Sequence, residues 1–193
     1  MRLLEPIQIQ LELTIMSLKS SLADSVRIRI ETSENPDECA AVRVVNESAF
    51  RSSEEADLVD KLRARGDALV SLVAEIDGSI VGHIMFSRMW VRTNSGDVSA
   101  VALAPMAVIP TYQRKGIGQL LVRHGLNILR DMGETIVIVV GHADYYPRFG
   151  FLTEAASSLH APFPREVFMA MELRKGALAG IEGSVVYPAP FGI

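Results

Sequence analysis

The chain of 193 residues is 49% hydrophobic and 22% charged, and its formal net charge at pH 7 is -4. These values predict one ordinary globular domain with a substantial core. The slightly acidic balance provides no overall positive field, which argues against a nucleic-acid binder and against attachment to anionic membranes. The single cysteine, Cys39, excludes an internal disulfide and a multi-cysteine zinc site and fits a reducing cytoplasm. We interpret it as a small core residue.

Residues 1–25 are predicted to form an N-terminal extension to a single domain at 26–193. Apolar and polar residues alternate strictly from about 7 to 15, which is the period of a half-buried strand. A secretion signal would need a continuous apolar segment, which Glu5, Gln8, Gln10 and Glu12 interrupt, and no other stretch is long and apolar enough to cross a bilayer. Because an exposed edge strand can pair with another chain, we expect a cytoplasmic homodimer in which the extension takes part.

The domain is predicted to begin with a strand at 26–30, where apolar and charged residues alternate. A helix should follow this strand, because Ser33 or Asn35 can cap it and Pro36 suits its first turn. A second helix is predicted from about Ser53 to Arg65, and its acidic start complements the positive end of the helix dipole.

A block rich in strands comes next. The β-branched and apolar runs Ala68 to Ile76 and Ile80 to Val91 are separated by Asp77-Gly78, a strong hairpin signal. A third run, Val98 to Ile109, contains Pro105, which cannot donate a hydrogen bond to a sheet. This proline therefore predicts an edge, a bulge or a place where two strands part.

The remaining elements alternate between helix and strand. They are predicted as a helix at about Gly116 to Met132, a strand at Thr135 to Val140, a helical turn near Tyr145 to Arg148, and strands at Val167 to Leu173 and Ser184 to Tyr187. Strands and helices are intermixed along the chain, which indicates an α/β or α+β sheet with helices packed on it.

The segment from Met106 to Gly118 runs from a strand through a tight loop into the start of a helix. The first amides of a helix have no internal partner and favour anions. Gly116 and Gly118 leave room for a diphosphate to approach the backbone, and Arg114 and Lys115 add positive charge. The segment is not a Walker A motif, because the chain contains no Gly-Lys dipeptide, and it lacks the third glycine of a dinucleotide fingerprint. The glycine spacing alone fits a tight turn equally well.

The run Val108-x-Pro110-x-x-Gln113-x-x-Gly116-x-Gly118 resembles the acyl-coenzyme A (CoA) motif of the GNAT superfamily of N-acetyltransferases. Tyr145-Tyr146-Pro147-Arg148-Phe149-Gly150-Phe151 is similar to a second segment of that family, and the residues after Phe163 are similar to a bacterial YhbS-like subgroup. The resemblance extends over about 26 to 190.

This resemblance implies a GNAT-like mixed, mostly antiparallel sheet of about seven strands flanked by about four helices. It implies an enzyme that moves an acetyl group from acetyl-CoA to a primary amine by direct attack in a ternary complex. The strand ending at Ile109 should splay from the strand at 135–140 and admit the pantetheine arm. The residues implied in cofactor binding are Met106, Ala107, Val108, Gln113, Arg114, Lys115, Gly116, Ile117, Gly118, His142, Tyr145 and Arg148.

The resemblance also implies the catalytic groups. The backbone amide of Val108 is expected to bind the thioester oxygen, and Tyr146 is expected to protonate the departing thiolate as a general acid. Tyr145 is the alternative, because one residue of register decides which hydroxyl faces the thioester. His142 and Asp144 stand where many members of the family have an asparagine, which puts that cofactor contact in question.

Several alternatives stay open from the sequence. Glu47 and Asp97 are candidates for the general base, but neither is identified by a motif. His142 and Asp144 lack a further ligand cluster at recognisable spacing, so we expect no metal. A non-catalytic acyl-CoA sensor and a protein that acts by association through its extension are the alternatives to an enzyme. The acceptor is a small-molecule amine, a peptide N-terminus or a protein lysine, with a small molecule favoured.

Overall fold

The computed structural model describes residues 25–193, and the strand predicted at about 7 to 15 lies outside them. A single sheet contains the strands β1 (Arg27–Ile30), β2 (Ala68–Ile76), β3 (Ser79–Thr93), β4 (Gly96–Val108), β5 (Ile136–Val140), β6 (Leu159–His160), β7 (Phe168–Glu172) and β8 (Gly183–Val186). The α-helices in this part of the chain are α2 (Pro36–Phe50), α3 (Glu54–Arg65) and α4 (Ile117–Asp131), and short 3-10 turns connect other elements. None of these helices is long and apolar enough to cross a membrane.

The predicted mixed, mostly antiparallel sheet is confirmed, with two differences in detail. Residues 25–193 form eight strands rather than about seven, because the two-residue strand β6 was not predicted. Three α-helices flank the sheet rather than about four, because the predicted turn near Tyr145 is the short 3-10 helix η2 (Tyr146–Phe149).

The ends of the first two helices follow local chemistry. The side chain of Asn35 accepts hydrogen bonds from the backbone amides of Asp37 and Glu38, so Asn35 is the cap of α2 and Ser33 is not. Cys39, which we expected in the core, is only partly buried and donates its thiol to the carbonyl of Ser33 at 3.3 Å. At the other end of the pair, α3 stops at Gly66, whose positive φ of 73° continues the chain in a left-handed turn.

The long strand β3 lies at the centre of the sheet. Asp77 and Gly78 both have positive φ and join it to β2, as the hairpin signal predicted. The first part of β3 pairs with β2, and its residues Trp90 to Arg92 pair with β8 beyond the end of β2. The other edge of β3 pairs with β4 along most of its length. Two strands that lie far apart in the chain, β2 and β8, thus pair with the same edge of β3.

The strands β4 and β5 are paired over a short distance only. They run parallel, and the paired residues are Val101 to Leu103 with Val137 to Val139. Pro105 follows directly, and the register of β4 on β3 shifts at the same place, between the pairs that contain Leu103 and Met106. Two of the outcomes predicted at Pro105 are therefore confirmed, a bulge in the pairing of β4 with β3 and the parting of β4 from β5. They are related, because a bulge bends one strand away from its neighbour.

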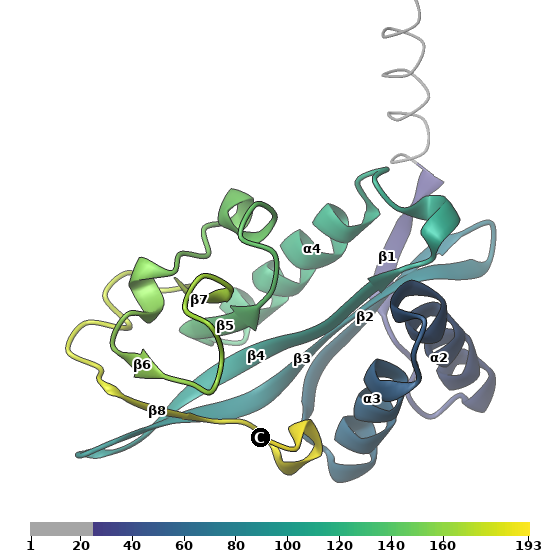
Figure 1. Cartoon of the computed structure of the whole chain (residues 1–193). Coiled ribbons are helices and arrows are strands. Elements are labelled where there is room, and N and C mark those ends of the chain that lie inside the picture. Colours follow the sequence, from purple (N-terminus) through teal and green to yellow (C-terminus); the bar gives the residue numbers. More distant parts are fainter. Residues whose placement is uncertain (1–24) are drawn as a thin grey trace, which may run out of the picture.

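The helices cover both faces of the sheet (Figure 1). Helix α4 packs its apolar side on one face, where Leu121 and Leu126 lie in the same buried cluster as Phe86 and Val137. Gly125 of α4 lies so close to Phe86 that a Cβ atom there would be 2.1 Å from the ring. On the opposite face, α2 and α3 cover a second cluster, whose buried residues are Val42, Val59, Leu62, Val73 and Met85.

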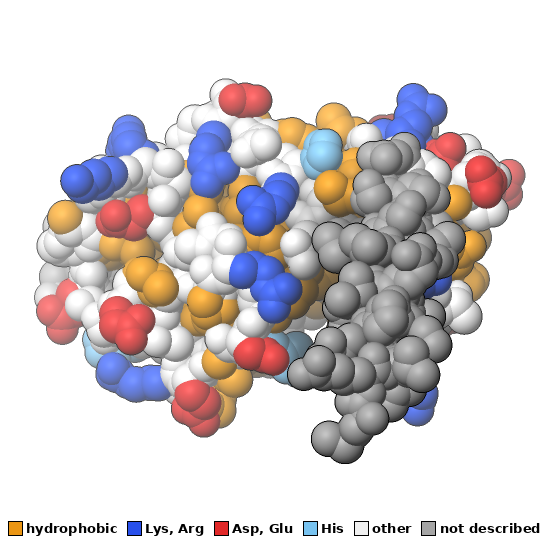
Figure 2. All heavy atoms as spheres, turned by 90° about the horizontal axis from the view of Figure 1, so that it is seen from above, with side chains coloured by type: hydrophobic (Ala, Val, Ile, Leu, Met, Phe, Trp, Pro, Cys, Tyr) orange, Lys and Arg blue, Asp and Glu red, His pale blue; other side chains and the backbone are white. Residues whose placement is uncertain are grey.

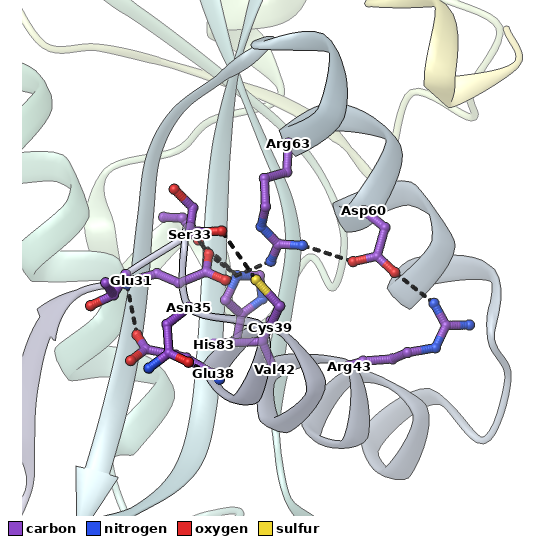
Figure 3. Close-up of polar contacts among 12 residues, drawn as sticks. Glu31, Ser33, Asn35, Glu38, Cys39, Val42, Arg43, Asp60, Arg63 and His83 are labelled. Carbon is purple, nitrogen blue, oxygen red and sulfur yellow. Dashed lines mark hydrogen bonds and ion pairs between the residues drawn. The ribbon is translucent and has the colours of Figure 1, made fainter.

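A cluster of charged and polar side chains is buried with this second group (Figure 3). The Arg63 guanidinium donates to the Glu31 carboxylate at 2.5 Å, and the side chain of Glu31 is only 1% exposed. Ser71 donates its hydroxyl to the same carboxylate, and His83, fully buried, lies with its Nε2 atom 2.9 Å from the Ser71 hydroxyl. The Nδ1 atom of His83 lies 3.1 Å from the side-chain amide of Asn46 on α2.

These contacts determine which ring nitrogen of His83 carries the proton. The Ser71 hydroxyl gives its hydrogen to Glu31, so it can only accept from His83 Nε2–H, and His83 Nδ1 then accepts from the Asn46 amide. Burial, with a smaller contribution from the positive charge of Arg63, lowers the pKa of His83 to about 3. The buried polar cluster, which we define as Glu31, Asn46, Arg63, Ser71 and His83, therefore ties α2 and α3 to the sheet through a neutral imidazole.

Candidate active site

The loop between β4 and α4 has an unusual backbone. After the 3-10 turn η1 (Pro110–Tyr112), Arg114 and Gly116 both have positive φ, 60° and 91°, and Gly116 caps α4. The first hydrogen bond to the Gly116 carbonyl comes from Leu120, so the earlier amides of α4 lack helical partners. A Cβ atom on Gly116 would meet no atom within 4 Å, so the approach to these amides is open. The tight loop running into open helix amides, which the sequence predicted, is thus present, and such amides suit an anion.

The edge of β4 beside this loop faces away from β3. The amide of Ile109 donates to the Val81 carbonyl on β3 at 3.0 Å. Because successive residues of a strand direct their amide and carbonyl groups to opposite edges, Val108 directs both of its groups toward the side from which β5 has parted. The side-chain amide of Gln113 donates to the Val108 carbonyl at 2.9 Å. Gln113 thus satisfies this carbonyl and braces the loop against the strand end.

A cavity of about 620 Å³ lies between the loop, the end of β4 and the turn η2. We call it the loop cavity. Most of the residues expected to bind the cofactor line it together: Met106, Ala107, Val108, Gln113, Arg114, Gly116, Ile117, Gly118, Tyr145 and Arg148. Two expected residues do not. Lys115 places its ammonium over the ring of Tyr112, 5.3 Å from the ring centre, and His142 lines a neighbouring cavity.

The neighbouring cavity has a volume of about 640 Å³ and contains Glu55 and Leu58 of α3 in its wall. We call it the α3 cavity. It is also bordered by Pro105 of β4 and by Val140 at the end of β5, so it occupies the space where these two strands have parted. The two cavities share the wall residues Phe50, Met106, Asp144, Tyr145 and Arg148. They are therefore neighbouring parts of one cleft.

The two tyrosines of the η2 region differ in position. Tyr145 lines both cavities, and its hydroxyl would lie 2.8 Å from a Cβ atom on Gly118 at the start of α4. The Arg148 guanidinium stacks over its ring at 4.6 Å. Tyr146 is 7% exposed, lines the α3 cavity and packs against Gly141, where a Cβ atom would be 2.3 Å from the ring. Desolvation raises the pKa of both hydroxyls above the ordinary value of tyrosine, so both are protonated at neutral pH.

The carboxylates considered as general bases lie outside the cleft. Glu47 forms an ion pair with Arg43 on α2, and Asp97 pairs with Arg92 near the β3–β4 turn. Neither lines the loop cavity or the α3 cavity. Glu55 does line the α3 cavity, and its Oε2 atom is buried and accepts no hydrogen bond. The sequence shows Glu55 as part of an acidic first helical turn, which is an ordinary feature, so no local signal distinguishes it.

The charge around the cleft differs from the charge of the whole chain. On the face over α4 and η2, Lys and Arg side chains gather near the middle, while most Asp and Glu lie toward the edge (Figure 2). The charged residues that line the loop cavity are the basic Arg114 and Arg148 and the acidic Asp144. In residues 25–193 no three His, Cys, Asp or Glu side chains are grouped to hold a metal ion. Two basic residues against one acidic residue in the wall of the loop cavity favour an anionic ligand there, although the net charge of the chain is -4.

Known proteins are similar to this chain in both sequence and fold. A model described as the acetyltransferase (GNAT) family matches residues 37–151. Two proteins of Escherichia coli (strain K12) are similar to the chain. The one named uncharacterized N-acetyltransferase YjhQ is 44% identical over 126 residues, which cover 64% of this chain and 70% of YjhQ. The one named uncharacterized N-acetyltransferase YhbS is 33% identical over 167 residues, which cover 85% of this chain and 97% of YhbS.

Two crystal structures have the same architecture as this chain, and each contains CoA or its acetyl thioester. The YhbS protein from Escherichia coli in complex with CoA has a TM-score of 0.79 and 32% identity, covering 88% of this chain and 93% of that one. A GNAT family acetyltransferase from Brucella melitensis in complex with acetyl-CoA has a TM-score of 0.71 and 33% identity, covering 86% of this chain and 97% of that one. The region matched by the family model contains the loop at 113–118 and the turn η2.

Proposed function

The chain belongs to the acetyltransferase (GNAT) family and is an N-acetyltransferase, and we propose that it transfers acetyl from acetyl-CoA directly to a primary amine in a ternary complex. One observation carries this proposal: the strand edge freed by the parting of β4 from β5 lies in the same cleft as the open amides at the start of α4. A thioester on an extended arm needs such an edge, and its pyrophosphate needs such amides. The complexes of the two relatives with CoA and acetyl-CoA support the choice of ligand.

In this proposal the loop cavity takes the cofactor. The amides of residues 114–118 bind the pyrophosphate, and the positive φ of Arg114 and Gly116 turns them toward it. Arg148 and Lys115 supply positive charge at the margin of the site. The pantetheine arm lies along Met106 and Val108, where β5 is absent, and its thioester reaches the boundary between the two cavities near Tyr145.

The chemistry requires three things of the protein. The acceptor, with an ordinary ammonium pKa of roughly 10.4, must lose a proton before its nitrogen attacks the thioester carbon. The oxyanion of the tetrahedral intermediate needs a donor, and the Val108 amide on the free strand edge supplies it. The departing thiolate, with an ordinary pKa of about 8.5, needs a proton, and Tyr146 supplies it. Burial raises the pKa of the Tyr146 hydroxyl, so it is protonated at neutral pH and can donate a hydrogen bond to the departing sulfur.

The test is thiol release from acetyl-CoA across a panel of amines, with Tyr146→Phe and Tyr145→Phe as a matched pair. General acid catalysis contributes about a hundredfold or more to a rate. We therefore expect Tyr146→Phe to lower kcat by roughly this factor, with little change in acetyl-CoA binding. Tyr145→Phe should mainly weaken cofactor binding, because Tyr145 lines the loop cavity. Full activity of Tyr146→Phe would contradict the assignment, and CoA binding without turnover of any amine would favour a sensor.

Two further expectations stay proposals. We propose a homodimer that involves the strand at about 7 to 15. A chain beginning at Asp24 should then elute from gel filtration as a monomer, whereas the full chain elutes as a dimer. An unchanged assembly would contradict it. We also propose that the enzyme works in the cytoplasm, where acetyl-CoA and amine substrates are both available and Cys39 stays reduced.

A further inference from the structure

Glu55 stands apart from the other carboxylates of α2 and α3. Asp57 and Asp60 pair with Arg43, Asp60 also pairs with Arg63, and Glu31 is held by Arg63. Glu55, one turn earlier on α3, takes part in no ion pair within residues 25–193, and its Oε2 atom is buried without a hydrogen-bond partner. A buried carboxylate oxygen without a donor is unfavourable, so the site is incomplete as it stands.

The surroundings of Glu55 are mostly apolar. The wall of the α3 cavity is formed by Phe50, Leu58, Leu103, Pro105 and Val140 around this carboxylate. Phe50 is 40% exposed and Val140 is 37% exposed, although both are large hydrophobic residues. Exposed apolar surface around a half-buried carboxylate is typical of a ligand site rather than of a solvated helix end.

The other titratable groups of the same cavity are less suited to hold a cation. Asp144 and His142 are exposed to solvent at the rim, and Arg148 stacks over Tyr145 beside them. A carboxylate that faces water binds an ammonium weakly, whereas a partly enclosed carboxylate forms a strong charge-assisted hydrogen bond. The terminal torsion of a glutamate is broad and nearly two-fold, so rotation about it can present either oxygen of Glu55 to the cavity.

From these observations we propose that the α3 cavity binds the acceptor as a primary amine with an apolar body, and that Glu55 binds its amino group. This inference rests on the proposed function, which places the thioester at the boundary of the two cavities. The apolar body lies against Phe50, Leu58 and Val140, and the nitrogen stays between Glu55 and the thioester. Since β4 and β5 part in this cavity, the amine approaches the thioester from the side opposite the pyrophosphate loop.

The proposal defines the substrate class. A polycation or a lysine within an acidic, hydrophilic peptide would place its polar groups against the apolar wall and lose their hydration. An alcohol of the same shape could donate one hydrogen bond to Glu55 but would bring no positive charge to it. We therefore expect affinity to rise with the length of an alkylamine and to fall sharply when its nitrogen is replaced by oxygen.

The test compares hexylamine with hexan-1-ol, which has nearly the same shape but no charge. Binding of each is measured by calorimetry on the full chain saturated with CoA. The variants are Glu55→Gln and, as the matched control, Glu54→Gln, since Glu54 is the exposed neighbour that lines neither cavity. Hexylamine should bind the native protein about tenfold or more tightly than hexan-1-ol. In Glu55→Gln the two affinities should become similar, and in Glu54→Gln the difference should persist.

The outcomes separate the two claims. Failure of the native protein to bind CoA would contradict the proposed function and this inference with it. Normal CoA binding together with equal affinities for the two probes, or an undiminished preference in Glu55→Gln, would overturn the inference alone. Thiol-release kinetics give a second readout, in which Glu55→Gln should raise the KM for hexylamine about tenfold while the Kd for CoA stays the same.

Discussion

The loop cavity and the α3 cavity share a wall, but they are built in different ways. The main wall of the loop cavity is formed by consecutive residues, since the end of β4, the left-handed residues Arg114 and Gly116 and the start of α4 follow one another in the chain. Phe50 of α2 and the η2 region complete this wall. The α3 cavity is assembled from residues far apart in sequence, such as Glu55, Pro105 and Val140. The first is a local backbone structure, whereas the second exists only when α2 and α3 are docked on the sheet.

Because of this difference, acceptor binding and cofactor binding should depend on different parts of the molecule. The buried polar cluster of Glu31, Asn46, Arg63, Ser71 and His83 holds α2 and α3, the helices that contribute Phe50, Glu55 and Leu58 to the α3 cavity. The loop needs none of these contacts. Damage to the polar cluster should therefore affect the acceptor side first, and damage to the loop should affect the cofactor side first.

The largest effect is expected from Arg63→Met. The change leaves the Glu31 carboxylate, 1% exposed, without its cation, and breaking a buried ion pair in this way costs about 3–5 kcal/mol of unfolding free energy. Arg65→Met is the control, because Arg65 is 56% exposed where it pairs with Asp67 and should cost less than about 1 kcal/mol. Urea unfolding measures both, and equal losses in the two variants would contradict the importance of the polar cluster.

Gly116→Asp should instead weaken cofactor binding. The aspartate must adopt a φ of 91° and brings a negative charge to the amides proposed to bind pyrophosphate, so we expect CoA to bind about a hundredfold more weakly. Gly133→Asp is matched in backbone strain, with a φ of 82° and open space around it, but Gly133 lines neither cavity. Calorimetry with CoA distinguishes them, and a similar loss in both variants would assign the effect to strain.

The lowered pKa of His83 predicts that the stability of the protein depends on pH. Its pKa is about 3 in the folded protein and about 6.5 in the unfolded chain, so the unfolded chain binds more protons below pH 6.5. The stabilisation is complete above pH 6.5 and is lost as pH falls toward 3, at about 1.4 kcal/mol per pH unit from this group. Urea titrations at several pH values measure the slope, which should be smaller in His83→Gln. An identical slope would show that His83 is not the group responsible.

The smallest effect is expected from Gln113→Ala. It removes one hydrogen bond to the Val108 carbonyl, and a single bond of this kind contributes about 1 kcal/mol, or roughly fivefold in binding. The Kd for CoA should rise by about this factor, while the affinity for an amine in the α3 cavity stays nearly unchanged. Gln119→Ala, which also alters the wall of the loop cavity but not the Val108 carbonyl, is the control. A larger change in amine binding than in CoA binding would contradict the division between the cavities.

The sequence predicts the local features well because their causes are local. Pro36 after a capping residue, Asp77-Gly78 between two apolar runs and Gly66 behind a helix each determine the backbone at their own position. The loop from Gln113 to Gly118 belongs to the same class, which explains why its tight turn into the start of α4 could be predicted from its glycines.

The features that could not be predicted depend on contacts between distant segments. β6 has two residues and exists because Leu159 and His160 meet β8, more than twenty residues later. The buried polar cluster joins residues 31, 46, 63, 71 and 83, none of which stands out in its own segment. Glu55 is one of several acidic residues at the start of α3, and only the packed cavity distinguishes it from Glu54. Chemistry that arises from tertiary packing leaves no periodic signal.

The short pairing of β4 with β5 also has a consequence for the motions of the sheet. Three paired residues on each strand join β5 and β7 to the larger set formed by β1 to β4, so we expect the two groups to open as separate cooperative units. An extended ligand arm that lies in the gap would contact both groups and make their opening more concerted. We expect amide hydrogen exchange in β5 and β7 to slow when CoA is added, which would make the cofactor a structural part of the sheet that it binds.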